Sequence, residues 1–224
     1  MSETSKMDKK EIIARRVSKE LKNGDVVNLG IGTPTLAANY VPEGVTVIFQ
    51  SENGMLGIGP APTSDNADDT YTNAGGALIT AIPGASVFDN TMSFAVIRSG
   101  RVKTAVLGAL EVDEFGSIAN WMIPGKSVNG MGGAMDLVVG AKRIIVAMEH
   151  TVKGRPKILK KCTLPLTAAR EVDMIITDLC VIDVDHEHGL TLTELAPGVS
   201  IEDVKAATQA PIKVSPELKT MELF

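Results

Sequence analysis

The chain has 224 residues and 44% hydrophobic content, enough for one well-packed core, so we expect a single domain over residues 1–224. A formal net charge of −5, with acidic and basic residues mixed along the chain, argues against nucleic-acid binding and offers no basic stripe for a membrane surface. No apolar run reaches the roughly 18 residues of a membrane span, and residues 1–6 lack the apolar core of a signal peptide, so we expect a cytoplasmic protein.

The first expected element is an amphipathic helix that begins after Asp8. Asp8 and Glu11 have the spacing of a capping box, and apolar residues then recur at helical intervals until Asn23-Gly24 ends the run. Basic residues occupy the opposite face, which we interpret as solvated. These residues are Lys9, Lys10, Arg15, Arg16 and Lys19, of which Arg15 and Arg16 could also reach an anionic ligand.

A buried strand is expected next, from Val26 into Gly30 and Gly32, with Thr33-Pro34 placed to start a helix. The glycines match neither the dinucleotide-binding nor the Walker pattern, so they do not indicate a nucleotide site. Asn28 is an amide inside this apolar strand and must find hydrogen-bond partners there. Taken alone, the segment is best explained by a structural asparagine.

A second buried strand, expected over residues 45–50, ends abruptly at Glu52. Asn53-Gly54 is a strong turn signal, and Gly57 and Gly59 follow it closely. We therefore expect Glu52 where a parallel strand meets its loop, which is where α/β sheets bind ligands. The glycines would let the backbone approach such a ligand closely. On these residues alone, a structural role for Glu52 in the turn is as good an interpretation as a chemical one.

Strands and helices are expected to alternate along the rest of the chain. A glycine-rich segment at 125–133 leads into a helix and could hold an oxyanion on its backbone N–H groups. The other expected elements are an exposed Asp-rich loop at 63–70, a helix capped by Asp89, a strand at 104–110, a hairpin at 111–121 with solvated turn carboxylates Asp113 and Glu114, strands at 143–148 and 174–182, a short helix capped by Ser200 and a terminal strand after Pro211. This order predicts an α/β domain with a mainly parallel sheet and helices on both faces.

For three further groups of residues, a structural role is a better interpretation than a functional one. His186 and His188 fall at an expected hairpin tip, where an exposed turn is a better explanation than a metal site because a third ligand is missing. Cys162 and Cys180 lack CxxC spacing and are expected to be buried reduced thiols. The basic cluster at 153–161 could meet the phosphates of a nucleotide tail but is more often a solvated loop.

Four segments together resemble the β subunit of family I coenzyme A transferases of the acetoacetate and butyrate-acetoacetate type. They are Asn28-Leu29-Gly30-Ile31-Gly32, Ser51-Glu52-Asn53-Gly54, Gly130-Met131-Gly132-Gly133-Ala134-Met135-Asp136 and Pro165-Leu166-Thr167. The resemblance spans residues from about 10 to 210. It implies the α/β fold that this family shares with sugar-phosphate isomerases.

The resemblance also implies site residues and substrates. Glu52 takes the role of nucleophile, with Asn28 and the backbone N–H of Gly133 around the reacting carbonyl. The CoA and substrate loops would comprise Gly30, Gly32, Asn53, Gly54, Gly57 and Gly132. The implied reaction moves coenzyme A between a short-chain acyl-CoA and a carboxylic acid such as acetoacetate through a glutamyl-CoA thioester. CoA is then a substrate, and no tightly bound cofactor or metal is expected.

A partner subunit is implied in the same way. The family's α subunit carries a G-x-G-G-F motif that this sequence lacks, so we expect a homologous α subunit in an α2β2 or larger assembly. Two alternatives stay open: an acyl-CoA hydrolase on the same fold and a non-catalytic effector-binding relative. A hydrolase would release free CoA without an acceptor acid, whereas a binding module would not be inactivated by changes at Glu52.

Overall fold

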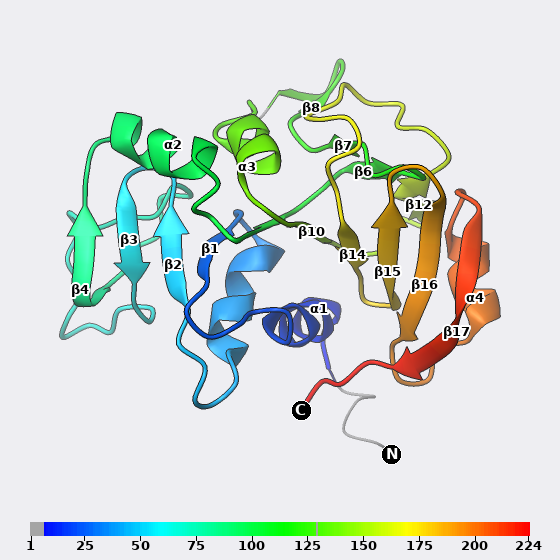
Figure 1. Cartoon of the computed structure of the whole chain (residues 1–224), viewed down its shortest axis with the longest axis horizontal. Helices are drawn as coiled ribbons and strands as arrows, with labels where there is room; N and C mark the ends of the chain where they lie inside the picture. The colour runs from blue at the N-terminus through cyan, green and yellow to red at the C-terminus, as the bar shows by residue number, and fades with distance from the viewer. Residues whose placement is uncertain (1–6, 129) are drawn as a thin grey trace.

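The protein is described by a computed structural model over residues 7–128 and 130–224, so the expectation about residues 1–6 lies outside the described residues. A ten-stranded sheet forms its centre (Figure 1). The strands lie in the order β17 (Ile212–Thr220), β16 (Gly189–Leu195), β15 (Cys180–Asp185), β14 (Met174–Ile176), β10 (Ile144–Ala147), β5 (Thr104–Leu107), β1 (Val26–Leu29), β2 (Ile48–Ser51), β3 (Met55–Ile58) and β4 (Ala81–Val87). The middle of the sheet, from β14 to β2, is parallel, and antiparallel pairs flank it on both sides. The predicted α/β fold is confirmed.

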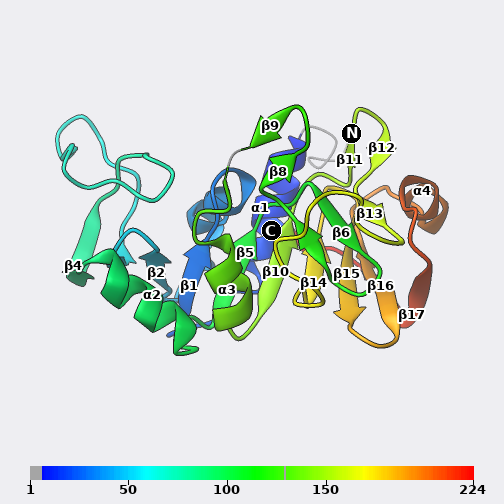
Figure 2. The ribbon, with the colours of Figure 1, turned by 90° about the horizontal axis from the view of Figure 1, so that it is seen from above.

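Helices cover both faces of this sheet (Figure 2). One face carries α1 (Lys9–Ser18) and the 3-10 helix η2 (Thr33–Tyr40), and the other carries α2 (Asn90–Arg98) and α3 (Ala134–Gly140). The remaining elements are α4 (Ile201–Ala207), β6 (Glu111–Asp113), β7 (Ile118–Ala119), β8 (Met122–Ile123), β9 (Ser127–Val128), β11 (Thr151–Val152), β12 (Arg155–Pro156) and β13 (Ile158–Leu159). No helix in the described ranges is long and apolar enough to cross a membrane.

The central strands are apolar on both faces because each face is covered. In β5, Ala105 and Leu107 pack with Ile97 of α2, whereas Val106 packs with Ile13 of α1 on the opposite face. The same alternation holds in β10. Two-sided burial therefore accounts for the uniformly apolar runs seen in the sequence.

The first helix departs from its expected surroundings. Its predicted capping box does not form, and the Glu11 carboxylate instead accepts a hydrogen bond from Arg15 Nε at 2.9 Å. The prediction that the basic face is solvated is wrong for Arg16, which is only 6% exposed. Its guanidinium donates to Glu194 at 2.6 and 2.9 Å and to Glu20 at 2.7 Å. A buried guanidinium needs such partners, and Glu194 comes from strand β16 far along the chain.

The prediction of one strand over 174–182 is also wrong. The Thr177 hydroxyl accepts hydrogen bonds from the backbone N–H groups of Leu179 and Cys180, both at 3.1 Å. This side-chain turn reverses the chain and separates β14 from β15, which then pair antiparallel. An apolar pattern alone does not reveal it.

Several other local predictions are confirmed. The Asp89 side chain accepts from Met92 N at 2.8 Å, and Ser200 forms a full capping box with Asp203. His186 and His188 lie at the tip of the β15–β16 hairpin, where His186 Nε2 is 3.1 Å from Val172 O and His188 Nδ1 is 3.0 Å from Asp185 Oδ1.

The two cysteines are free thiols, as predicted. Cys180 is buried, whereas Cys162 is only half-buried, so the prediction of burial is wrong for that residue. Burial raises the pKa of each thiol to about 12, which keeps both protonated at neutral pH.

His150, just after β10, gives the fold a pH dependence. It is fully buried, with Nδ1 2.9 Å from Thr177 Oγ1 and Nε2 2.9 Å from Thr208 Oγ1. Burial lowers its pKa from 6.5 to about 4; the nearby charge of Asp178 opposes the shift and that of Lys157 adds to it. The folded protein therefore holds His150 neutral at pH values where the unfolded chain protonates it.

We predict that the free energy of unfolding falls as the pH is lowered from 6.5 to about 4, because only the unfolded chain takes up this proton. The contribution is fully present above pH 6.5; the drop of roughly 2.5 pKa units, from 6.5 to about 4, corresponds to about 3 kcal/mol. Urea unfolding across this range should show a steeper loss for the native sequence than for His150→Gln, which cannot titrate. Equal slopes would contradict the assignment.

Candidate active site

The candidate site is assembled where β1 and β2 lie side by side. Their parallel register aligns Asn28 with Gln50, and Glu52 follows two residues later in the turn between β2 and β3. The expectation that Glu52 follows a parallel strand is confirmed, since β2 is parallel to β1; the loop is a tight turn because β3 returns antiparallel to β2. Gly54 N donates to Ser51 O at 3.0 Å and closes a tight turn around Glu52.

The Glu52 side chain is held between a buried amide and a piece of backbone. Asn28 Nδ2 donates to Glu52 Oε2 at 3.1 Å, and Asn28 is fully buried. Gly133, the residue before α3, lies against the other side: a Cβ built there would be 3.1 Å from Glu52 Cγ. Glu52 itself is only partly buried. The site therefore holds a carboxylate in a fixed position and leaves it accessible.

Two residues that the sequence did not single out anchor Asn28. Gln50 Oε1 accepts from Asn28 Nδ2 at 2.7 Å, and Gln50 Nε2 donates to Ser93 Oγ at 2.9 Å. A signal for Gln50 exists, since it is a second amide in a neighbouring apolar strand. Ser93 comes from α2, and only the packing of that helix brings it to the site.

Three of the expected loop glycines are required by close packing between strands. Gly30 N donates to Val106 O at 2.7 Å, and a Cβ on Gly30 would be 3.0 Å from that oxygen. A Cβ on Gly54 would overlap the carbonyl oxygen of Phe88, and one on Gly57 would be 3.0 Å from Ala85 Cα. The close approach of neighbouring backbone therefore requires glycine at these three positions.

The other expected loop residues are more open. Gly32 and Gly132 have positive φ values of 90° and 50° and have no atom within 4 Å of a built Cβ. Asn53 is exposed and donates to Thr72 O at 2.7 Å, which ties the turn to the following loop. Gly32 lies on the pocket beside Glu52, while Gly132 precedes Gly133.

A pocket of about 340 Å³ opens beside Glu52. Among the described residues that line it, Glu52 alone is charged, and the polar groups around it are neutral amides and hydroxyls. The lining residues are Leu29, Ile31, Gly32, Thr35, Leu36, Ala38, Asn39, Phe49, Gln50, Ser51, Glu52, Ile58, Gly59, Ala61, Asn73, Ala74, Gly75, Ala77, Leu78 and Ile79. Such a lining suits an uncharged, largely apolar group next to the carboxylate.

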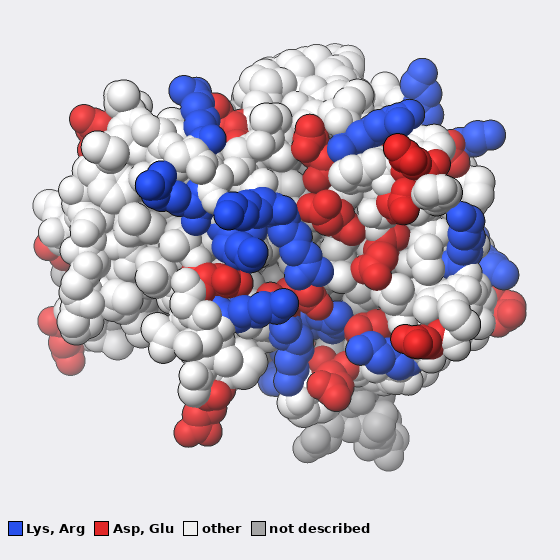
Figure 3. All heavy atoms as spheres, viewed as in Figure 1, with Lys and Arg blue, Asp and Glu red and all other residues white. Residues whose placement is uncertain are grey.

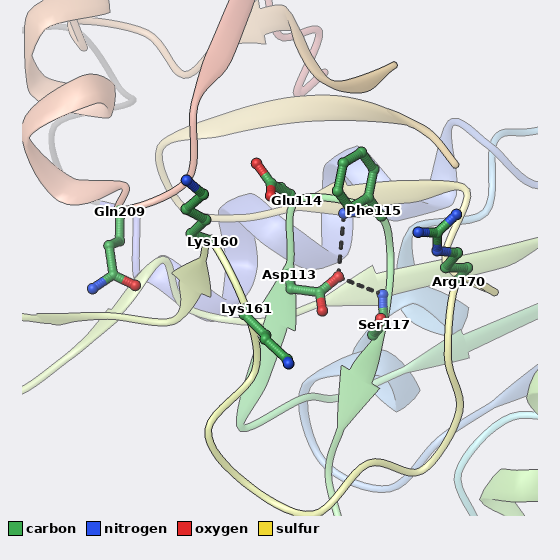
Figure 4. Close-up of a pocket in the computed structure, with 8 residues that line it drawn as sticks. All are labelled: Asp113, Glu114, Phe115, Ser117, Lys160, Lys161, Arg170 and Gln209. Carbon is green, nitrogen blue, oxygen red and sulfur yellow. Dashed lines mark hydrogen bonds between the residues drawn. The ribbon is translucent and has the colours of Figure 1, made fainter. Parts of the chain in front are cut away.

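A larger hollow, of about 760 Å³, lies away from this site beside β6 (Figure 4). It mixes carboxylates with Lys160, Lys161 and Arg170. Asp113 is buried rather than solvated, which corrects the prediction, because its carboxylate accepts from the N–H groups of Phe115 and Ser117 at 3.2 and 2.9 Å. The carboxylate of Asp113 thus stabilises its own turn, and the pocket beside Glu52 remains the better candidate site.

The fold and the site define an α/β protein with one carboxylate fixed at the edge of a neutral pocket, a class suited to acyl-group chemistry. Residues 10–207 match the family described as Coenzyme A transferase, and the chain therefore belongs to that family. The resemblance inferred from the sequence motifs is confirmed. The protein is a CoA-transferase, an enzyme that moves coenzyme A between an acyl thioester and a carboxylic acid.

Individual relatives within this family are similar to the chain over most of its length. It is 51% identical over 216 residues to the beta subunit of the acetate CoA-transferase of Escherichia coli (strain K12), covering 96% of this chain and 98% of the relative. It is 54% identical over 204 residues to one subunit of a probable succinyl-CoA:3-ketoacid coenzyme A transferase of Bacillus subtilis (strain 168), covering 91% and 94%. A solved acyl-CoA transferase of E. coli O157:H7, in a thioester complex with CoA, has the same fold, with a TM-score of 0.75 and 23% identity over 97% of this chain and 44% of that one.

The close approach of Gly133 to Glu52 yields a prediction. In Gly133→Ala the new methyl group would meet Glu52 Cγ at 3.1 Å and Phe94 Cζ at 3.2 Å, at an ordinary φ of −86°. We expect kcat/KM for CoA transfer to fall by about 10- to 100-fold, because small displacements of a reacting group are costly. Gly108→Ala is the control, since no atom lies within 4 Å of its built Cβ. An unchanged rate in Gly133→Ala, with the unfolding midpoint also unchanged, would show that the contact does not constrain Glu52.

Proposed function

We propose that this chain is the catalytic β subunit of a CoA-transferase that exchanges CoA between a short-chain acyl-CoA, such as acetyl-CoA or butyryl-CoA, and an acid such as acetoacetate. The observation that carries the proposal is the position of Glu52, a carboxylate held by a buried amide at the edge of a neutral pocket. The names of the relatives, an acetate CoA-transferase and a probable succinyl-CoA:3-ketoacid coenzyme A transferase, support short-chain acids and 3-ketoacids as substrates. Coenzyme A takes part as a substrate, and the chemistry requires no other cofactor.

The reaction would proceed by two symmetrical half-reactions with a covalent intermediate. The Glu52 carboxylate attacks the acyl-CoA carbonyl, and the C–S bond breaks. CoA departs as a thiolate, and the acyl group remains on Glu52 as a mixed anhydride. The thiolate then attacks the Glu52 carbonyl and expels the acyl group as a free carboxylate, which leaves a glutamyl-CoA thioester. The acceptor carboxylate repeats both steps in reverse order, and Glu52 is released as a carboxylate. No net proton, electron or water is consumed.

Asn28 and Gly133 would stabilise the negative charge that develops in these steps. The Asn28 amide already donates to Glu52 Oε2, an oxygen that can become an oxyanion when the Glu52 carbonyl is attacked. The Gly133 N–H forms no hydrogen bond within the described part of the chain, and Gly133 lies beside the Glu52 side chain. It is therefore free to serve as a second donor.

The pocket itself offers no charged partner for a second substrate carboxylate, such as that of the succinyl group in the name of the Bacillus subtilis relative. A second substrate carboxylate would need a cation or several donors when buried, and none of the described residues that line this pocket is Lys, Arg or His. Ile31 and Leu78 of the lining are 68% and 40% exposed. A partner that covers these residues would exclude water from the pocket. Water must be excluded because it would hydrolyse the thioester and anhydride intermediates.

We propose a homologous α subunit as that partner, since both relatives are named as one subunit of a transferase. The edge strand β4 offers an uncharged surface for it: most of its residues are exposed, and Val87 is 64% exposed. The opposite edge strand, β17, carries Lys213, Glu217 and Lys219, which discourage pairing. In Figure 3 the β2–β4 side of the molecule likewise carries few charged side chains. An exposed, uncharged edge of this kind indicates a surface that is covered in the assembly.

The assembly prediction compares the two edges of the sheet. Val87→Glu should weaken association with the α subunit at least roughly tenfold, because a charge on the covered edge would lose its water. Val214→Glu on β17 is the matched control and should assemble normally. Titration by analytical ultracentrifugation measures both. Equal association of the two variants would exclude β4 as the interface, and full transfer activity from the isolated chain would remove the need for a partner.

The catalytic prediction separates the nucleophile from the donor. Glu52→Gln should abolish transfer, because an amide provides no anionic oxygen to attack a thioester. Asn28→Ala should leave a slower, measurable enzyme, with kcat reduced by about 10²–10³. Steady-state transfer in the reconstituted complex, alongside CoA release without an acceptor acid, tests both. A normal rate in Glu52→Gln would end the mechanism, and equally fast CoA release without an acceptor would identify a hydrolase.

A further inference from the structure

The Asn28 amide sits in a crowded set of acceptors. Its Nδ2 lies 3.1 Å from Glu52 Oε2, 2.7 Å from Gln50 Oε1 and 3.2 Å from Gln50 O. Its carbonyl oxygen Oδ1 is buried and has no hydrogen-bond partner within the described residues. Buried polar atoms are rarely left in this state, so the orientation of the amide is imposed by its neighbours.

The direction of the Gln50 amide is set from its far side. Ser93 Oγ donates to Ser51 O at 3.4 Å, so the hydroxyl oxygen is free to accept from Gln50 Nε2 at 2.9 Å. The Gln50 amide therefore places its nitrogen toward Ser93 and its oxygen toward Asn28. Ser93 is fully buried and Gln50 is 2% exposed, so water does not compete for these groups.

The orientation of the Gln50 amide in turn fixes the orientation of the Asn28 amide. With Gln50 Oε1 facing it, Asn28 must present Nδ2, since turning the amide over would place its own oxygen against Gln50 Oε1 and the Glu52 carboxylate. The hydrogen bonds thus connect the backbone carbonyl of Ser51, through Ser93 and Gln50, to Asn28.

We propose that Gln50 is a positioning residue of the transferase, with Ser93 fixing its amide, and that together they hold the Asn28 N–H donor toward the reacting carbonyl of Glu52. Gln50 acts through Asn28 and does not itself take part in the chemistry. This role rests on the proposed nucleophilic role of Glu52. It predicts that loss of Gln50 Oε1 removes the shortest of the three contacts that hold Nδ2, so that the Asn28 amide can shift away from Glu52 and the oxyanion loses a donor.

A double-mutant cycle on the reconstituted complex tests the proposal. Gln50→Met keeps the side-chain length and removes the acceptor, and kcat/KM should fall by about 10- to 100-fold, a partial form of the loss expected when a donor is removed. In the Asn28→Ala background the same change should alter the rate by less than about twofold, because the amide it orients is gone. Ser93→Ala should cost less, about three- to tenfold, and should add nothing to Gln50→Met.

Different outcomes would contradict the role of Gln50 and the proposed function. If Gln50→Met slows Asn28→Ala by the same factor as it slows the native enzyme, Gln50 acts independently of Asn28 and the proposal is wrong. If Glu52→Gln retains activity, the proposed function fails first. If Gln50→Met does not assemble, the Ser93→Ala cycle against Asn28→Ala decides, with the same criterion.

A structural readout covers the case in which Asn28→Ala is too slow to measure. A crystal structure of the Ser93→Ala or Gln50→Met complex should show that the Asn28 side chain has moved beyond hydrogen-bond distance of Glu52 or that Oδ1 has gained a donor. An Asn28 amide that keeps its contacts, including 3.1 Å to Glu52, would overturn the proposal.

Discussion

The parallel register between β1 and β2 is the constraint on which the site depends. It aligns Asn28 with Gln50, and Glu52 follows Gln50 by two residues, the interval at which side chains return to the same face. The three side chains therefore meet on one face at the end of two adjacent strands. Because side chains alternate along a strand, a shift of one residue would turn Asn28 away from Glu52. The covered faces of the sheet oppose such a shift, since it would also move buried apolar residues to the wrong side. The same strand register is therefore needed both to bury the apolar core and to align the site residues.

Polar groups inside this apolar sheet mark the site. Where β5 and β10 bury aliphatic side chains on both faces, β1 and β2 bury two amides, and the two are hydrogen-bonded to each other. Leaving Asn28 Oδ1 without a donor among the described residues costs stability. In the proposed mechanism that cost is offset by catalysis: the Asn28 N–H donor already points at Glu52, which is the preorganisation that charge development in a transition state requires.

The sequence alone predicted the features that depend on neighbouring residues. Glu52 at the end of a strand, the helix cap of Asp89 and the need of Asn28 for partners all follow from local patterns. Features that depend on distant segments could not be predicted: the ion pair that buries Arg16 joins it to a residue 178 positions away, and Ser93 reaches the site only through the packing of α2. The fold class was accessible because both-sided burial leaves uniformly apolar runs, whereas the flanking antiparallel pairs depend on turns such as the one closed by a threonine side chain.

A covalent test at Glu52 addresses the central claim most directly. If Glu52 carries CoA as a thioester, its activated carbonyl lies within five-membered-ring distance of its own backbone nitrogen, and only the packed fold keeps the two apart. Heating the acyl-CoA-treated complex should allow ring closure to an acylated pyroglutamate, followed by hydrolysis of the bond to Ser51. Denaturing electrophoresis with intact mass should then show an N-terminal fragment that ends at Ser51 and a C-terminal fragment that begins with a blocked pyroglutamyl residue. Cleavage that is equal without acyl-CoA, or that persists in Glu52→Gln, would contradict a thioester at Glu52.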